Sequence, residues 1–258
     1  MIRWFEYQQV YEPSRVIEGS ATSLSPGFED VYLTAQDGVR LNGWFLAAPP
    51  GSRRSRLVLL LLHGNGGNIS HRLDYYATWL ELGLNVFAID YRGYGLSEGR
   101  PGEAGTYLDA QAAYAWLRQK GFQPENIILL GKSLGGGVAS ELAIREKVGG
   151  LILQNTYTRI VDIAAELFPW LPVRWMNTIK YDTQGKLPRI NVPLLVMHSR
   201  EDRYIRYHHA ERNFAAGNEP KMIWEIAGEH NQTLEAGRSR YLEGLELYLR
   251  TYFHMKDD

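Results

Sequence analysis

The stretch NIILLGKSLGGG, residues 126–137, decides the fold. Residues 127–130 are apolar strand formers, and a helical pattern follows from Ser133 to Lys147. The G-x-S-x-G sequence between them is typical of a nucleophilic serine on a sharp turn between a strand and a helix. We expect Gly131 and Gly135 to leave room where the chain doubles back. Ser133 would then be exposed at a helix N-terminus, whose dipole favours developing negative charge.

Two other interpretations fit part of this stretch. Residues 131–133 match the end of a phosphate-binding P-loop, but that loop needs a glycine five residues before Gly131, where this chain has Asn126. It also needs a flexible stretch, and strand formers stand there instead, so we reject it. A glycine-rich helix start, with Ser133 as a simple N-cap residue, remains open from this stretch alone.

Short apolar runs predict eight β-strands, over residues 31–33, 41–46, 57–62, 86–89, 127–130, 151–153, 194–197 and 222–226. From the third onward they are almost wholly apolar, which is typical of strands buried on both faces of a parallel sheet. Helical patterns lie over residues 72–82, 104–120, 133–147, 208–216 and 234–255. The first two strands have only short connections and should pair antiparallel. The alternation predicts an α/β fold with helices on both faces of a mostly parallel sheet, and ligands at the carboxyl ends of its strands.

A glycine-rich turn, His63 to Asn68, directly follows the third predicted strand. Such a turn lets backbone N–H groups face a site, and acyl transfer needs two such donors for its oxyanion. We expect the pair to be the amides of Asn65 and Leu134. The turn does not match the glycine fingerprint of dinucleotide-binding proteins, because the third glycine of that fingerprint is absent. We interpret His63 as a buried residue that shapes the turn rather than as a catalytic base.

Two further polar loops follow the seventh and eighth predicted strands, at residues 197–202 and 227–231. They offer Asp202 and His230, so the chain order is serine, aspartate, histidine, which is the order of an α/β-hydrolase triad. In that arrangement Ser133 attacks an acyl carbonyl, His230 moves its proton, and Asp202 holds the imidazole. Glu201 is the competing carboxylate, and Glu229 is a weaker competitor.

Composition narrows the class of partner and cofactor. The chain has 258 residues, a formal net charge of −1 and no cysteine. Without a basic patch, the charge term that drives nucleic-acid binding is missing, so we expect no nucleic-acid partner. No H-E-x-x-H or similar spacing suggests a metal, and we expect no cofactor. His208, His209 and His254 fall in polar helical patterns and should be solvated.

Targeting signals are not visible in the sequence. Residues 1–10 hold no apolar region of a secretory signal, and the strongest apolar run, residues 57–62, is far shorter than a membrane span of about 18 residues. We therefore expect a cytoplasmic protein without a transmembrane segment, as a monomer or small homo-oligomer.

Several motifs together resemble the serine hydrolases of the α/β-hydrolase superfamily, over about residues 30–252. They are His63-Gly64-Asn65-Gly66, Asp90-Tyr91-Arg92-Gly93-Tyr94-Gly95-x-Ser97, Gly131-x-Ser133-x-Gly135, His198-Ser199-x-x-Asp202 and Gly228-x-His230. Residues 11–15 and 37–44 resemble the small-capped branch related to bud-emergence proteins and protein depalmitoylases. Members of that branch often carry an N-terminal membrane anchor, which we do not expect here.

The resemblance implies an eight-stranded sheet in one domain, residues 1–258, with Ser133, Asp202 and His230 as triad. It favours Asp202 over Glu201, and it makes residues 90–97 a structural loop. It also implies a small cap at about residues 156–190. We hypothesise that aromatic and apolar residues of this cap line an acyl pocket; these are Tyr157, Phe168, Trp170, Trp175 and Met176. Ordinary packing of the cap is the alternative for each of them.

The sequence thus predicts a metal-independent serine carboxylesterase acting on small-molecule esters with short- to medium-chain acyl groups, through an acyl-enzyme. An acyl-protein thioesterase or a peptidase with the same triad is the second hypothesis. A non-catalytic binding module of the same fold is the third.

Overall fold

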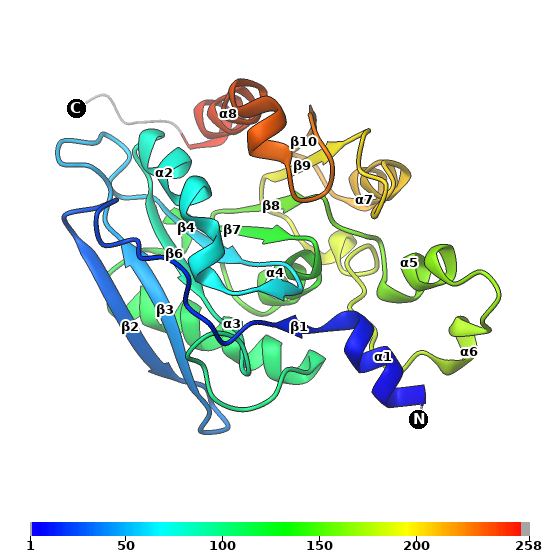
Figure 1. Ribbon diagram of the computed structural model, residues 1–258. Coiled ribbons are helices and arrows are strands. Elements are labelled where there is room, and N and C mark those ends of the chain that lie inside the picture. The colour runs from blue at the N-terminus through cyan, green and yellow to red at the C-terminus, as the bar shows by residue number, and fades with distance from the viewer. Residues whose placement is uncertain (1, 254–258) are drawn as a thin grey trace.

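An eight-stranded sheet forms the centre of the computed structural model, which describes residues 2–253 (Figure 1). Its order is β10-β9-β8-β7-β4-β6-β3-β2. The strands are β2 (Phe28–Thr34), β3 (Arg40–Leu46), β4 (Val58–Leu62), β6 (Asn85–Ile89), β7 (Ile127–Lys132), β8 (Gly150–Gln154), β9 (Leu194–Ser199) and β10 (Lys221–Ile226). β3 pairs antiparallel with β2 and with β6, and the remaining pairs are parallel. The predicted α/β-hydrolase sheet is confirmed strand by strand.

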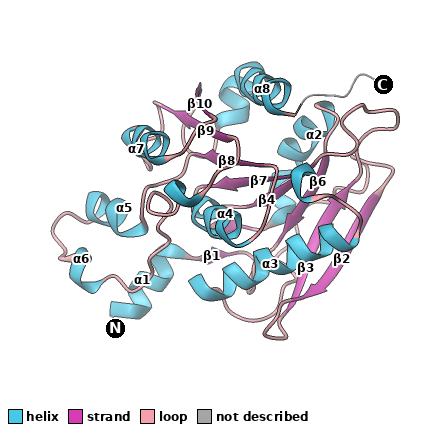
Figure 2. Cartoon of the chain, turned by 180° about the vertical axis from the view of Figure 1, so that it is seen from behind, coloured by secondary structure: helices cyan, strands magenta, loops and turns pink. Residues whose placement is uncertain are grey.

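Helices cover both faces of this sheet (Figure 2). The helices α2 (Leu73–Glu81) and α8 (Thr233–Tyr252) pack on one face. The helices α3 (Glu103–Gln119), α4 (Leu134–Arg145) and α7 (His208–Ala216) pack on the other. In β4, Leu60 and Leu62 enter one core while Leu59 and Leu61 enter the other, so an apolar residue is needed at every position.

The segment between β8 and β9, where the sequence predicts a small cap, leaves the sheet; we refer to it as the cap. It contains α5 (Ile160–Leu167) and α6 (Val173–Met176). Short 3₁₀ helices occur at η1 (Ile69–Arg72), η2 (Pro124–Asn126) and η3 (Leu187–Arg189).

The first residues form a helix that the sequence analysis did not predict, α1 (Ile2–Val10), which lies beside α5 and α6 (Figure 1). The Glu6 carboxylate accepts hydrogen bonds from Asn177 Nδ2 and from the Thr178 and Ile179 amides, at 2.8–2.9 Å. Beyond α1, the strand β1 (Glu12–Pro13) pairs with β5 (Gly66–Gly67) in the glycine-rich turn. The N-terminal segment is thus tied to the cap and to the candidate site.

Two predicted helix ends differ from the structure. Ser133 precedes α4 rather than belonging to it, because its φ of 51° is not helical. The last helix is interrupted inside its span at Gly237, where φ is −163° and ψ is 56° and where a Cβ would lie 2.8 Å from Ala227 Cβ. Residues 254–255 of that prediction, and with them His254, lie outside the described residues.

Candidate active site

Ser133 occupies the sharp turn between β7 and α4. Its φ of 51° and ψ of −117° lie in a region that costs a non-glycine residue on the order of 1–3 kcal/mol. The turn closes only because its neighbours lack side chains. A Cβ on Gly131 would lie 2.5 Å from the Gly135 carbonyl oxygen, and a Cβ on Gly135 would overlap the Leu62 carbonyl. This strained turn holds the serine at the edge of the sheet.

Three residues from three strand ends meet at this edge. The His230 Nε2 atom lies 3.0 Å from Ser133 Oγ, and its Nδ1 atom lies 2.6 Å from Asp202 Oδ2. Asp202 follows β9 and His230 follows β10, so the parallel sheet brings the carboxyl ends of β7, β9 and β10 to one place. Both distances are those of hydrogen bonds, and the set has the geometry of a nucleophile, a base and an orienting carboxylate.

Asp202 is buried and receives several hydrogen bonds. Its Oδ1 accepts from the amides of Tyr204 and Ile205, at 2.9 and 2.8 Å, and its Oδ2 accepts from Asn155 Nδ2 at 2.9 Å. Burial by itself would raise the pKa of Asp202, but the His230 bond and charge and the Ile205 amide together lower that pKa below its ordinary value. The carboxylate therefore stays ionised beside the imidazole. Asn155 was not identified from the sequence, although it directly follows β8.

The two competing carboxylates lie elsewhere. Glu201 is exposed, and its amide donates to Ser199 Oγ. Glu229 faces Arg203, with 3.5 Å between Oε1 and Nε. Only Asp202 among these acids contacts His230.

The glycine-rich turn lies directly against Ser133. A Cβ on Gly64 would lie 3.4 Å from Ser133 Cβ. The Asn65 amide N–H donates no hydrogen bond to any group within residues 2–253. Leu134 is the first residue of α4, so its amide has no carbonyl one turn earlier to bind. The amide N–H groups of Asn65 and Leu134 thus lie next to Ser133, and neither makes a hydrogen bond within a helix. His63 is buried and bonds the Gly64 carbonyl at 2.7 Å through Nδ1, which shapes the turn.

An apolar pocket of about 70 Å³ opens beside Ser133. Asn65 and Leu134 line it, as do the cap residues Tyr157 and Phe168. The other apolar walls come from α5, from Ile205 and from Val10 of α1. The contribution of α1 was not predicted, because nothing in the sequence of residues 2–10 marks it as part of a site.

Three cap residues expected in the pocket are placed outside its wall. Trp170 and Trp175 are 73% and 94% exposed. They belong to the loop after α5 and to the one-turn helix α6, which project from the body (Figure 2). Met176 lines a neighbouring groove instead.

A polar network under the sheet edge holds the His230 loop. The Thr233 hydroxyl, three residues after His230, lies 2.7 Å from the Tyr75 hydroxyl. Gln154 Nε2 contacts both hydroxyls at 3.3 Å, and Lys132 Nζ lies 3.4 Å from Tyr75 Oη. Burial lowers the pKa of Lys132 below its ordinary value.

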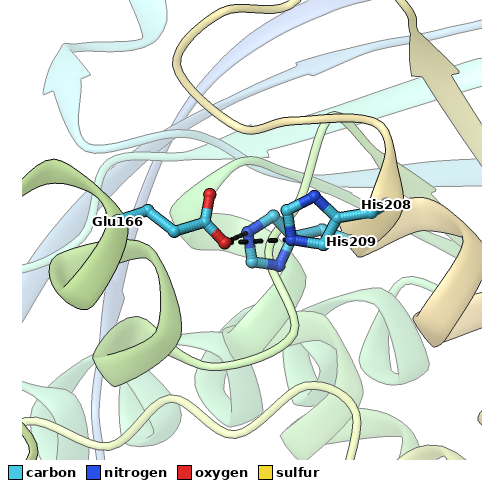
Figure 3. A group of neighbouring side chains, drawn as sticks. All are labelled: Glu166, His208 and His209. Atoms are coloured by element: carbon cyan, nitrogen blue, oxygen red, sulfur yellow. Dashed lines mark ion pairs between the residues drawn. The ribbon is translucent and has the colours of Figure 1, made fainter.

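A second polar cluster joins the cap to α7, and it consists of Glu166, His208 and His209 (Figure 3). Glu166 Oε1 lies 2.9 Å from His208 Nε2 and 3.3 Å from His209 Nε2. The expectation that both histidines are solvated is wrong for His209, which is fully buried beside Glu166 of α5. Burial lowers the pKa of His209 to about 4.

Among residues 2–253, this cluster is the group of side chains with ligand atoms close enough to share a metal ion. However, the Thr158 amide N–H donates to His209 Nδ1 at 3.2 Å. Nδ1 therefore presents a lone pair, and the neutral ring carries its proton on Nε2. A protonated nitrogen cannot bind a metal, so we interpret the cluster as a polar link between α5 and α7.

None of the helices in the described part of the chain could cross a membrane.

Comparisons with known proteins agree with this architecture. The family model described as alpha/beta hydrolase fold matches residues 58–184. The chain is 35% identical to the uncharacterized protein Rv2307c of Mycobacterium tuberculosis, over 88% of this chain and 81% of that protein. It is 32% identical to the alpha/beta hydrolase domain-containing protein WAV2 of Arabidopsis thaliana, over 96% of this chain and 86% of that protein. It is 33% identical to the protein bem46 of Schizosaccharomyces pombe, over 78% of this chain and 72% of that protein.

Among solved structures, the esterase Pf2001 of Pyrococcus furiosus is similar to this chain, with a TM-score of 0.77. The match covers 94% of this chain and all of that one, at 20% sequence identity. At this identity the likeness shows the fold alone.

Proposed function

Because the chain belongs to the α/β-hydrolase superfamily, in the branch that includes the bud-emergence protein bem46, we propose that it is a serine carboxylesterase. The observation that carries this proposal is the continuous chain of contacts from Ser133 Oγ through His230 to Asp202, at 3.0 and 2.6 Å. The similar solved structure, the Pyrococcus furiosus esterase, shows that this fold can carry an esterase.

The geometry supports acylation of Ser133 with His230 acting first as a general base and then as a general acid. Ser133 Oγ attacks the ester carbonyl while His230 Nε2 takes the hydroxyl proton, and ionised Asp202 stabilises the imidazolium. The tetrahedral oxyanion accepts hydrogen bonds from the Asn65 and Leu134 amides. When the intermediate collapses, His230 returns its proton to the leaving alcohol, and the acyl group remains on Ser133.

Deacylation repeats these roles with water as the nucleophile. His230 takes a proton from the water, whose oxygen attacks the acyl carbon. Collapse of the second tetrahedral intermediate breaks the acyl bond to Ser133 Oγ, which regains its proton from His230. The products are a carboxylic acid and the starting enzyme.

The pocket indicates the acyl part of the substrate. Its lining, between the cap, α1 and the serine, contains no charged side chain among the described residues, which suits an uncharged hydrocarbon chain. A cavity of about 70 Å³ is small beside the roughly 300–1,000 Å³ of typical ligand pockets. We therefore propose short- to medium-chain acyl esters of small molecules as substrates.

The test is hydrolysis of p-nitrophenyl esters from acetyl to palmitoyl by the wild type and by Ser133→Ala. We expect activity that is highest at short to medium chains and is lost in the variant. Labelling of Ser133 by an organophosphonate, without hydrolysis of any ester, would instead direct attention to thioesters and peptides. Absence of both labelling and hydrolysis would favour a non-catalytic binding module.

A further inference from the structure

Exposed large aromatic side chains occur on α1 and on the neighbouring cap. Trp4 and Phe5 of α1 are 63% and 42% exposed, and the exposure of Trp170 and Trp175 is higher still. Phe168 connects the two groups, because its ring centroid lies 5.8 Å from that of Phe5 and 5.9 Å from that of Trp170. We call these five residues the aromatic face. α1, α5 and α6 project together from one side of the molecule (Figure 1).

The aromatic face is continuous with the candidate active site. A second groove of about 70 Å³ runs beneath it, between α1 and the cap, and Phe5 and Met176 lie in its wall. This groove shares Val10, Ile160 and Phe168 with the pocket beside Ser133. Phe168, whose ring contacts that of Trp170, therefore borders both the groove and the pocket beside Ser133. Whatever covers the face also covers the entrance for substrate.

Two exposed cationic side chains lie beside the aromatic face. Arg174 in α6 is exposed, and so is Lys180, whose Nζ contacts the carbonyl of Asn177 in the groove wall. Residues 167–180 contain no acidic side chain. Three nearby carboxylates are bonded within the protein. Glu6 accepts from residues 177–179, and Glu103 accepts from the Lys180 amide at 2.6 Å. Asp162 binds Arg159 at 2.7 Å and also faces Arg174 at 3.9 Å.

We propose that the aromatic face docks on an anionic lipid surface, from which acyl esters enter the pocket. Tryptophan side chains favour the boundary between water and hydrocarbon, and neighbouring arginine and lysine add attraction to anionic headgroups. Self-association of the chain through the same face is the alternative, and analytical ultracentrifugation distinguishes the two. A tightly fitting protein would close the entrance to Ser133. The docking itself is independent of catalysis, whereas the supply of substrate rests on the proposed function.

The experiment is co-sedimentation of the full-length Ser133→Ala protein with vesicles of phosphatidylcholine alone and with one quarter phosphatidylglycerol. Trp170→Ala/Trp175→Ala removes the two most exposed rings of the face. Tyr32→Ala/Leu247→Ala is the matched control, because these side chains are exposed on β2 and α8, away from the cap. Thermal unfolding of each variant verifies that it is folded.

We expect binding to the anionic vesicles, weakened at least tenfold in the tryptophan double variant and unchanged in the control. Arg174→Glu should weaken binding to anionic vesicles and leave binding to neutral ones unchanged. Added salt should reduce the difference between the two vesicle types. In the same buffer, p-nitrophenyl ester hydrolysis by the wild type reports the proposed function separately.

The docking proposal is overturned if vesicles do not bind the protein, or if the tryptophan double variant binds as well as the control. It is also overturned if the aromatic face instead makes a dimer, seen by analytical ultracentrifugation and abolished by the tryptophan changes. Vesicle binding without ester hydrolysis would remove the proposed function and leave the docking surface in place.

Discussion

The Asn155 side-chain amide donates to Asp202 Oδ2, the same oxygen that accepts from His230 Nδ1. Asn155 itself has a φ of 44°, so a strained residue holds the amide in place. The bond fixes the carboxylate rotation and withdraws negative charge from the oxygen that faces the imidazole.

We predict that Asn155→Ala lowers kcat on the order of tenfold, which corresponds to about 1.4 kcal/mol of transition-state stabilisation. Without this donor the Asp202 carboxylate is free to rotate and orients the His230 imidazole less well. Steady-state kinetics of ester hydrolysis measure the effect. Asn191→Ala, on an exposed loop, is the control. An unchanged kcat would indicate that Asn155 only packs.

The identity of the acid can be tested by a pair of neighbouring carboxylates. Asp202→Asn should lower kcat on the order of 10⁴-fold, because the amide stabilises the wrong imidazole tautomer. Glu201→Gln should remain close to the wild type, since Glu201 is exposed and does not contact His230. The measurement is the rate of ester hydrolysis by each variant. A large loss in Glu201→Gln with a near-normal rate in Asp202→Asn would make Glu201 the acid.

The size of the acyl pocket can be reduced at Ala164 in α5, which lines it. Ala164→Phe should lower kcat/KM for octanoyl relative to acetyl esters by about tenfold or more, because the new ring occupies space that the longer chain needs. Ala165→Phe is the matched control, since Ala165 lines neither the pocket nor the groove. Equal ratios for the two variants would show that acyl chains bind elsewhere.

The Tyr75–Thr233 hydrogen bond should position the loop that carries His230. Thr233→Val keeps the shape but leaves the buried Tyr75 hydroxyl with weaker partners, at a cost of about 1 kcal/mol in the free energy of unfolding. We expect kcat to fall several-fold while KM changes little. Thr251→Val makes the same change at an exposed position in α8 and should have neither effect. A loss of stability without a change in kcat would restrict Thr233 to a structural role.

Stability should depend on pH through His209. In the folded protein burial lowers its pKa to about 4, whereas in the unfolded chain it is about 6.5. Between these values the unfolded state binds more protons. The stabilisation is therefore complete above pH 6.5 and is lost as pH falls toward 4. Urea unfolding at pH 8 and pH 5 should show the wild type losing about 2 kcal/mol more than His209→Asn.

His198, which is also buried with a lowered pKa, is present in both proteins, so the difference isolates His209. Identical pH dependence in the two proteins would contradict the assignment of a buried neutral His209.

The positions of the sheet and of Ser133, Asp202 and His230 were predictable from the sequence. Strands buried on both faces must be apolar throughout, so the sequence shows where each strand ends. A parallel sheet brings the carboxyl ends of its strands to the same edge. The sharp turn at Ser133 was also predictable from local sequence, because it requires glycines where a side chain would not fit.

Other features depended on contacts between distant segments, which no local pattern records. Asn155 meets Asp202 across 47 residues, and Tyr75 meets Thr233 across 158. α1 becomes part of the pocket only by docking on the cap. The cap tryptophans show the same limit, because an aromatic residue type does not tell whether its ring faces the pocket or the solvent. The direction of each ring depends on how the short cap helices pack against the rest of the domain, so only the tertiary structure determined it.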